Sequence, residues 1–100
     1  MRLPQDCGNM TELRVEIDAL DGELIALLAR RVSYIDRAVE IKSRDGLPAN
    51  IQSRVEDVIQ KVKAQAKNHG FSPELTEKLW REMIDWSIAR EEQALSAKGN

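Results

Sequence analysis

The chain has 100 residues, 42% of them hydrophobic, so we expect one domain over residues 1–100. Its 15 basic and 17 acidic residues give a formal net charge of -2, which excludes a strong global attraction to nucleic acid or to anionic membranes. No apolar run approaches the roughly 20 residues of a membrane-spanning helix, and a single cysteine, Cys7, excludes an internal disulfide. We therefore expect neither nucleic-acid nor membrane partners.

The N-terminal segment, residues 1–10, lacks the long apolar stretch of a secretion signal. We expect it to be mobile and the protein to be cytoplasmic. The lone histidine, His69, lies beside Gly70 in a predicted turn and has no evident reason to meet Cys7, so we assign Cys7 no catalytic role.

The first predicted element is one long helix over residues 11–44. Asn9 or Thr11 can cap it, and Glu12 lies in its first turn. Gly22 costs this helix about 1 kcal/mol relative to alanine but need not break it, whereas "DGLP" at residues 45–48 supplies a stop. Apolar residues recur along it in steps of three, four or seven, at Leu13, Ile17, Leu20, Leu24, Leu28, Ile35 and Val39.

Two further helices are predicted. One has an apolar face ending in "NHG" at residues 68–70, and the other opens at "SPE", where Ser72 is the N-cap and Pro73 the first helical residue. No strand-like alternation occurs, so the predicted class is all-α with three helices. The apolar residues of these helices are Val55, Val58, Ile59, Val62 and Ala66, then Leu75, Leu79, Trp80, Met83, Ile84, Ile88 and Leu95.

The first helix is too long for a compact monomer. Residues 11–44 would extend about 50 Å, whereas a compact chain of this size has a diameter of roughly 35 Å. The simplest solution is an intertwined homodimer, in which a second copy packs along the exposed seam. The alternative is a kink at Gly22 that folds the segment into two helices.

Two cations lie on the apolar seam of this helix. Arg31 and Lys42 are 11 residues apart, which places them within about 20° of the same face and roughly 16 Å apart along the axis. A buried cation without a partner is costly, so they predict a bound anion or paired carboxylates. The alternative, that they extend to solvent or pair with core glutamates, stays open at this point.

Three other residues are also candidates for such a site: Arg14, Ser87 and Glu91. Arg14 is about 25 Å from Arg31 along the axis, so it can share a ligand only from a second, antiparallel copy. Ser87 and Glu91 continue the apolar stripe of the last helix, and a carboxylate there is an ion-pair partner or a functional group.

Several motifs together resemble the all-helical chorismate mutase family and the related isochorismate pyruvate lyases, over nearly the whole chain. They are "LRVEIDALDGELIALLARR" at residues 13–31, Lys42 near the end of the first helix, Arg54 in "SRVED" and Glu91 in "DWSIAREE". The resemblance implies an intertwined homodimer and a small dicarboxylate substrate, chorismate or isochorismate. It also implies a pericyclic reaction that needs no cofactor and no metal.

The resemblance also implies roles. Arg14 reaches the partner's site and binds one carboxylate, while Arg31 binds a carboxylate within its own subunit. Lys42 donates to a carboxylate and to the ether oxygen, and Glu91 donates to that same oxygen. The predicted substrate-binding residues are Arg14, Arg31, Lys42, Arg54, Ser87 and Glu91, of which Arg31, Lys42 and Glu91 are the predicted catalytic residues.

Two departures affect the predicted reaction. Glu91 stands where many mutases have glutamine, and a glutamate donates a hydrogen bond only when protonated, so we expect activity to increase below neutral pH. Val55 stands where many mutases have glutamate, and Tyr34 and Trp86 also look lyase-like, although Ser87 matches the mutases. We favour a chorismate mutase that forms prephenate. Alternatives are an isochorismate pyruvate lyase, a mutase of a chorismate analogue, and a non-catalytic helical dimer.

Overall fold

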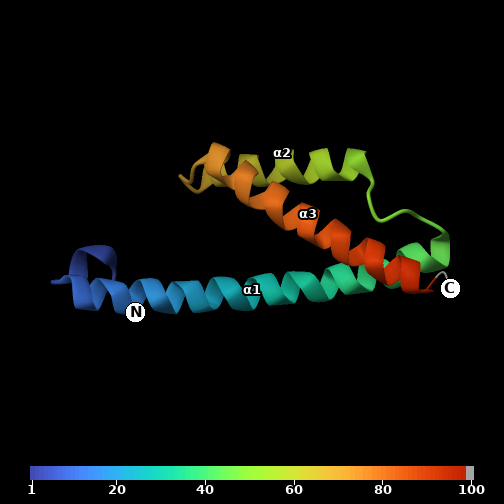
Figure 1. Cartoon of the computed structure of the whole chain (residues 1–100). Helices are drawn as coiled ribbons and strands as arrows, with labels where there is room; N and C mark the ends of the chain where they lie inside the picture. The colour runs from blue at the N-terminus through green and yellow to red at the C-terminus, as the bar shows by residue number, and fades with distance from the viewer. Residues whose placement is uncertain (99–100) are drawn as a thin grey trace. The chain divides into compact units, whose positions relative to one another are not determined.

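The computed structural model describes residues 1–98 as helices joined by short loops (Figure 1). After a 3-10 turn, η1 (Pro4–Asp6), come α1 (Met10–Asp45), α2 (Gln52–Asn68) and α3 (Pro73–Lys98). No strand occurs within residues 1–98, which confirms the all-α prediction. The chain divides into two compact units, the first Met1–Tyr34 and the second from residue 35 onward, and α1 contributes to both.

The first unit shows why α1 begins where it does. The Asn9 side chain accepts a hydrogen bond from the Glu12 backbone N–H at 2.9 Å and donates one to the Glu12 carboxylate at 3.1 Å. This reciprocal pair satisfies a backbone donor that the first helical turn leaves open. Asn9, and not Thr11, is therefore the cap. The alternative of a kink at Gly22 is wrong, because α1 continues through it.

The N-terminal segment belongs to the same unit. Arg2 Nε lies 3.4 Å from Glu12 Oε2, and Leu3, Pro4 and Cys7 line a cavity of about 200 Å³ together with residues of α1 such as Ile17. The predicted mobility of residues 1–10 stays a prediction.

The apolar stripe of α1 is largely uncovered in the single chain. Leu20 and Leu24 expose 49% and 57% of their surface, and Ile17 and Leu28 expose 46% and 40%. Scattered exposed apolar side chains are ordinary, but a continuous stripe at helical spacing is typical of an interaction surface.

The second unit holds the buried core. α2 packs against α3, and the loop after α1 leads into α2 (Figure 1). Ile59 of α2 is completely buried, and Val39, Ala49, Ala66 and Ile84 are nearly so. Within residues 1–98, no helix combines the length and the apolar character that crossing a bilayer requires.

Local chemistry sets the helix ends in this unit. Gly46 and Gly70 have φ values of 69° and 72°, in the left-handed region that favours glycine. The residue after each glycine donates its N–H to a carbonyl of the preceding helix, Leu47 to Lys42 at 2.8 Å and Phe71 to Ala66 at 2.8 Å. Both helices thus end in the Schellman motif. The predicted stop signals are confirmed.

The start of α3 also follows its sequence signal. Ser72 Oγ accepts the N–H of Leu75 at 3.1 Å, which confirms Ser72 as the N-cap. The buried hydroxyl of Thr76 donates to the Ser72 carbonyl at 2.8 Å, so its burial leaves no donor unsatisfied.

Ion pairs join α2 to α3 at the surface of the second unit. Glu77 of α3 lies 3.0 Å from Lys63 of α2 and 2.8 Å from Arg81 one turn along α3. The hydrogen bond from Lys63, and to a lesser extent the one from Arg81, lowers the pKa of the Glu77 carboxyl. Arg81 also reaches back to Glu56 of α2 at 3.3 Å.

Candidate functional site

A buried ion pair joins the end of α1 to α3. Lys42 Nζ donates to Glu91 Oε2 at 2.9 Å, and the side chains expose only 17% and 5% of their surfaces. Lys42 Nζ also donates to the Ala49 carbonyl at 2.8 Å. Taking two charges out of water is costly, so groups of this kind are either well paired or have a task. Of the six predicted site residues, Lys42 and Glu91 are brought into direct contact.

Ser87 lies one turn before Glu91 on the same face of α3. It is 4% exposed, and its Oγ has no hydrogen-bond partner among the described residues. A buried hydroxyl without a partner costs free energy, and native structures contain few of them. A bound ligand is one group that can satisfy such a hydroxyl.

Arg54 lies in the first turn of α2 and is exposed. Its Nη1 donates to Asp57 Oδ2 at 2.7 Å, and Lys61 Nζ lies 3.0 Å from the same oxygen. The hydrogen bond from Lys61, and to a lesser extent the one from Arg54, lowers the pKa of the Asp57 carboxyl. The Arg54 guanidinium thus pairs with a neighbour on its own helix rather than with the Lys42–Glu91 pair, and its role in substrate binding stays a prediction.

Arg14 and Arg31 lie on the part of α1 that belongs to the first unit. Arg14 is exposed, and Arg31 is half-buried. Their predicted contacts with a ligand stay predictions.

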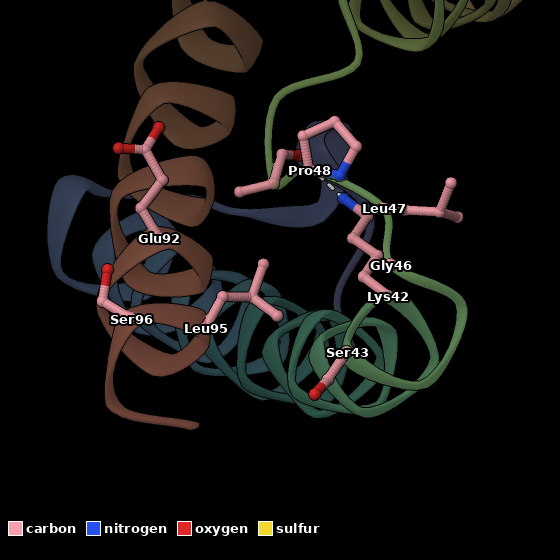
Figure 2. Close-up of a pocket in the computed structure, with 9 residues that line it drawn as sticks. Lys42, Ser43, Gly46, Leu47, Pro48, Glu92, Leu95 and Ser96 are labelled. Carbon is pink, nitrogen blue, oxygen red and sulfur yellow. Dashed lines mark hydrogen bonds between the residues drawn. The ribbon is translucent and has the colours of Figure 1, made fainter. Parts of the chain in front are cut away.

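A cavity of about 580 Å³ opens beside Lys42 in the second unit (Figure 2). The loop residues Gly46, Leu47, Pro48 and Ala49 form one wall, and α3 forms the other. The Leu95 side chain projects from α3 toward the loop. A dashed line in Figure 2 marks the hydrogen bond that Lys42 donates to the Ala49 carbonyl. Among the predicted site residues, this cavity includes only Lys42.

Comparison with known protein families covers most of the chain. Residues 13–92 match the family described as chorismate mutase type II. The chain belongs to this family. The predicted resemblance and the predicted all-α subunit of three helices are therefore confirmed, whereas the intertwined homodimer stays a prediction. The matched segment contains every predicted site residue.

Relatives within or near the family carry different names. The T-protein of Haemophilus influenzae is 34% identical over 84 residues, which cover 84% of this chain but 22% of the T-protein. The isochorismate pyruvate lyase of Pseudomonas aeruginosa is 28% identical over 92 residues, 91% of this chain and 89% of the lyase. The chorismate mutase of Methanocaldococcus jannaschii is 26% identical over 91 residues, 91% of this chain and 92% of that enzyme. The chain thus spans about a fifth of the T-protein and nearly all of the other two.

Two features of this family member were not predicted from its sequence. One is the Ala49 carbonyl that accepts from Lys42. The other is a bidentate pair in which Arg90 Nε and Nη2 donate to Asp36 at 2.7 and 3.1 Å, with the guanidinium 5.5 Å from the Trp86 ring centre. The hydrogen bond from Arg90 lowers the pKa of Asp36. No periodic signal connects residues 54 positions apart, so local pattern could not find this pair.

Proposed function

We propose that this chain is a chorismate mutase, which rearranges chorismate to prephenate. The observation that carries the proposal is the buried Lys42–Glu91 pair, with the unpartnered hydroxyl of Ser87 one turn away on α3. Family membership over residues 13–92 supports the same assignment. A cation, a carboxyl and a hydroxyl without a partner form a polar group suited to a small oxygen-rich ligand.

The chemistry asks little of the protein beyond positioning and charge stabilisation. In the rearrangement, the ether C–O bond breaks as a C–C bond forms, and negative charge builds on the ether oxygen. Lys42 has three N–H donors, two of which go to Glu91 and Ala49, so one remains for the substrate. Fixed donors aimed at an oxygen that gains charge lower the barrier, and holding the compact conformer lowers it further.

Glu91 acts in this proposal as a neutral acid. Its Oε2 accepts from Lys42, which leaves Oε1 to carry the proton of the neutral form. A protonated carboxyl donates to the ether oxygen, whereas the ionised form only accepts.

Arginines supply the carboxylate contacts. Helical spacing predicts that Arg31 and Lys42, which are 11 residues apart, share one face of the first helix. The planar guanidinium matches a carboxylate in a bidentate way. We propose that Arg31 binds one carboxylate of the substrate, and that Arg54 adds positive charge from the start of α2.

A second copy of the chain completes the proposed site. The exposed stripe of Ile17, Leu20, Leu24 and Leu28 is the surface we expect it to cover. Arg14 on the same helix would then reach the partner's ligand. Mixing Arg14→Ala with Arg31→Ala subunits should restore about one intact pocket per mixed dimer. No recovery over either parent would argue that both arginines act within one subunit.

An isochorismate pyruvate lyase is the second candidate. In that reaction the ether C–O bond breaks while a ring hydrogen moves to the enolpyruvyl carbon, giving salicylate and pyruvate. Val55 in place of a glutamate, and the match over most of the Pseudomonas aeruginosa lyase, favour this reading. A non-catalytic helical dimer is disfavoured because it gives no reason for an unpartnered buried hydroxyl. A cytoplasmic location stays a prediction.

Identification of the products separates these candidates. The purified protein is incubated with chorismate and, separately, with isochorismate, and the products are resolved by chromatography. Prephenate from chorismate, lost in Lys42→Ala, is the expected result. Salicylate and pyruvate from isochorismate at a far higher rate would assign the lyase, and no turnover of either substrate would leave the non-catalytic dimer.

A further inference from the structure

We infer that the turn formed by residues 46–49 is a positioning element for the Lys42 ammonium. This inference rests on the proposed function, in which Lys42 contacts the substrate. The turn joins α1 to the segment that leads into α2, and it forms one wall of the cavity shown in Figure 2.

Lys42 is attached to this turn at both its backbone and its side chain. The Leu47 N–H donates to the Lys42 carbonyl at 2.8 Å, and Lys42 Nζ donates to the Ala49 carbonyl at 2.8 Å. The first bond closes the helix end, and the second fixes the tip of a side chain with many rotamers. A single short turn therefore contacts both the backbone carbonyl and the side-chain tip of Lys42.

Gly46 makes this geometry accessible. Its φ is 69°, a backbone conformation that L-residues with a side chain rarely adopt, and it reverses the chain direction directly after α1. The reversal brings Ala49, only 6% exposed, back against the side chain of Lys42. A residue that resists positive φ at position 46 would shift the Ala49 carbonyl away from Nζ.

The two acceptors together fix where the third N–H of Lys42 points. An ammonium is tetrahedral, so holding two of its three N–H bonds on Glu91 and Ala49, from two separate segments, determines the third direction. The Ala49 carbonyl is neutral and has no protonation state to change. It therefore holds Nζ in place without cancelling its charge, whether Glu91 is ionised or protonated.

The chain offers a matched control for testing this role. Gly70 has nearly the same φ as Gly46, and a Cβ added at either position meets no atom within 4 Å. Its turn joins α2 to α3, and its hydrogen bonds go to Ala66 and Lys67 rather than to Lys42. Gly46→Ala and Gly70→Ala thus impose similar backbone strain, but only Gly46→Ala disturbs the Lys42 contact.

Steady-state kinetics with chorismate give the first readout. We expect Gly46→Ala to lower kcat/KM about tenfold, mainly through kcat, while Gly70→Ala stays within about twofold of wild type at a similar fall in Tm. Gly46→Asn should recover most of the loss, because asparagine tolerates positive φ better than alanine. Equal kinetic effects of Gly46→Ala and Gly70→Ala would overturn the inference.

Chemical modification of lysines gives a readout that does not depend on activity. Acetylation of Lys42 is followed by mass spectrometry relative to Lys61, whose side chain is 64% exposed. We expect the Lys42 to Lys61 rate ratio to rise at least about threefold in Gly46→Ala and to stay unchanged in Gly70→Ala. An unchanged ratio in folded Gly46→Ala overturns the inference. A Lys42 that reacts as fast as Lys61 in the wild-type protein also overturns the inference. This second outcome can be measured even if Gly46→Ala fails to fold.

The same experiment separates this inference from the proposed function. If wild-type protein turns over neither chorismate nor isochorismate, the proposed function fails, and the acetylation ratios still report whether the turn holds Lys42. If turnover occurs and the ratios do not respond to Gly46→Ala, the proposed function stands and the positioning role fails.

Discussion

Lys42 of α1 and Glu91 of α3, 49 positions apart in the sequence, meet in a buried ion pair 2.9 Å long. The pair is shielded from solvent, since the two side chains expose 17% and 5% of their surfaces. It joins the C-terminal end of α1 to the late part of α3 and places a cation and a carboxyl side by side. The proposed chemistry depends on both groups, and so does the stability of this end of the second unit.

Removal of one member of this pair should destabilise the fold more than removal of both. Lys42→Met leaves the Glu91 charge buried without its partner, which we expect to cost about 3 kcal/mol in the free energy of unfolding. Lys42→Met combined with Glu91→Met should regain most of that loss, because two apolar side chains of similar volume replace the pair. Urea unfolding followed by circular dichroism measures the free energy of unfolding of both variants relative to wild type. A double variant that is less stable than Lys42→Met would contradict this account of the pair.

Substitution of Glu91 by glutamine tests the role of Glu91. A glutamine amide always donates through its N–H, whereas a carboxyl donates to the ether oxygen only when it is protonated, so Glu91→Gln should raise kcat/KM for chorismate. The measurement is kcat/KM of both proteins in the same buffer. A Glu91→Gln variant that is no faster than wild type would count against this role.

Ser87 and Thr76 form a matched pair of buried hydroxyls on α3. The Thr76 hydroxyl is bonded to a carbonyl, while the Ser87 hydroxyl has no partner among residues 1–98. Thr76→Val should therefore cost about 1 kcal/mol of stability, whereas Ser87→Ala should cost nothing or gain up to about 1 kcal/mol. If Ser87 binds substrate, Ser87→Ala should also raise KM roughly fivefold.

Thermal unfolding without ligand, together with steady-state kinetics, checks both halves of this prediction. Thr76→Val serves as the control for the kinetics, since it should leave KM near the wild-type value. A Ser87→Ala variant that loses stability and keeps its KM would show that the hydroxyl serves the fold instead of a ligand.

The ion pairs of Glu77 predict a defined loss of stability in acid. Because hydrogen bonds from Lys63 and Arg81 lower its pKa from 4.5 in the folded state, Glu77 stabilises the fold above that value. This contribution disappears as pH falls through the lowered folded pKa, where the carboxyl takes up a proton. Wild type should therefore exceed Glu77→Gln in urea midpoint at pH 7, and the difference should shrink as pH falls below 4.5. Glu82→Gln is the matched control on the exposed surface of α3, and a difference that stays constant with pH would exclude this contribution.

The helix ends were predictable from the sequence because single residues determine them. Asn9 and Ser72 cap their helices through their own side chains, and Gly46 and Gly70 end theirs through positive φ. These are interactions between residues a few positions apart, which local sequence encodes directly. The uninterrupted course of α1 through Gly22 followed from the small cost of one glycine in a long helix.

The site was predictable only in part. Helical spacing and family resemblance singled out Lys42, Ser87 and Glu91, which the fold places at one end of the second unit. The Ala49 carbonyl was not predictable, because backbone carbonyls look alike in every sequence and only the path of the turn aims this one at Lys42. The ligand contacts of Arg14 and Arg31 stay predictions, because local patterns do not encode the position of a second chain.

The most direct test of the central claim is the ratio of kcat/KM for chorismate to kcat/KM for isochorismate, measured on one preparation of the protein. Related enzymes with a shared pocket can act weakly on each other's substrates, so detection of a product does not identify the main reaction. The ratio of the two kcat/KM values does identify it. We predict a ratio above one, with prephenate as the product and with both activities abolished in Lys42→Ala. A ratio far below one, with salicylate and pyruvate as the main products, would contradict the assignment as a chorismate mutase.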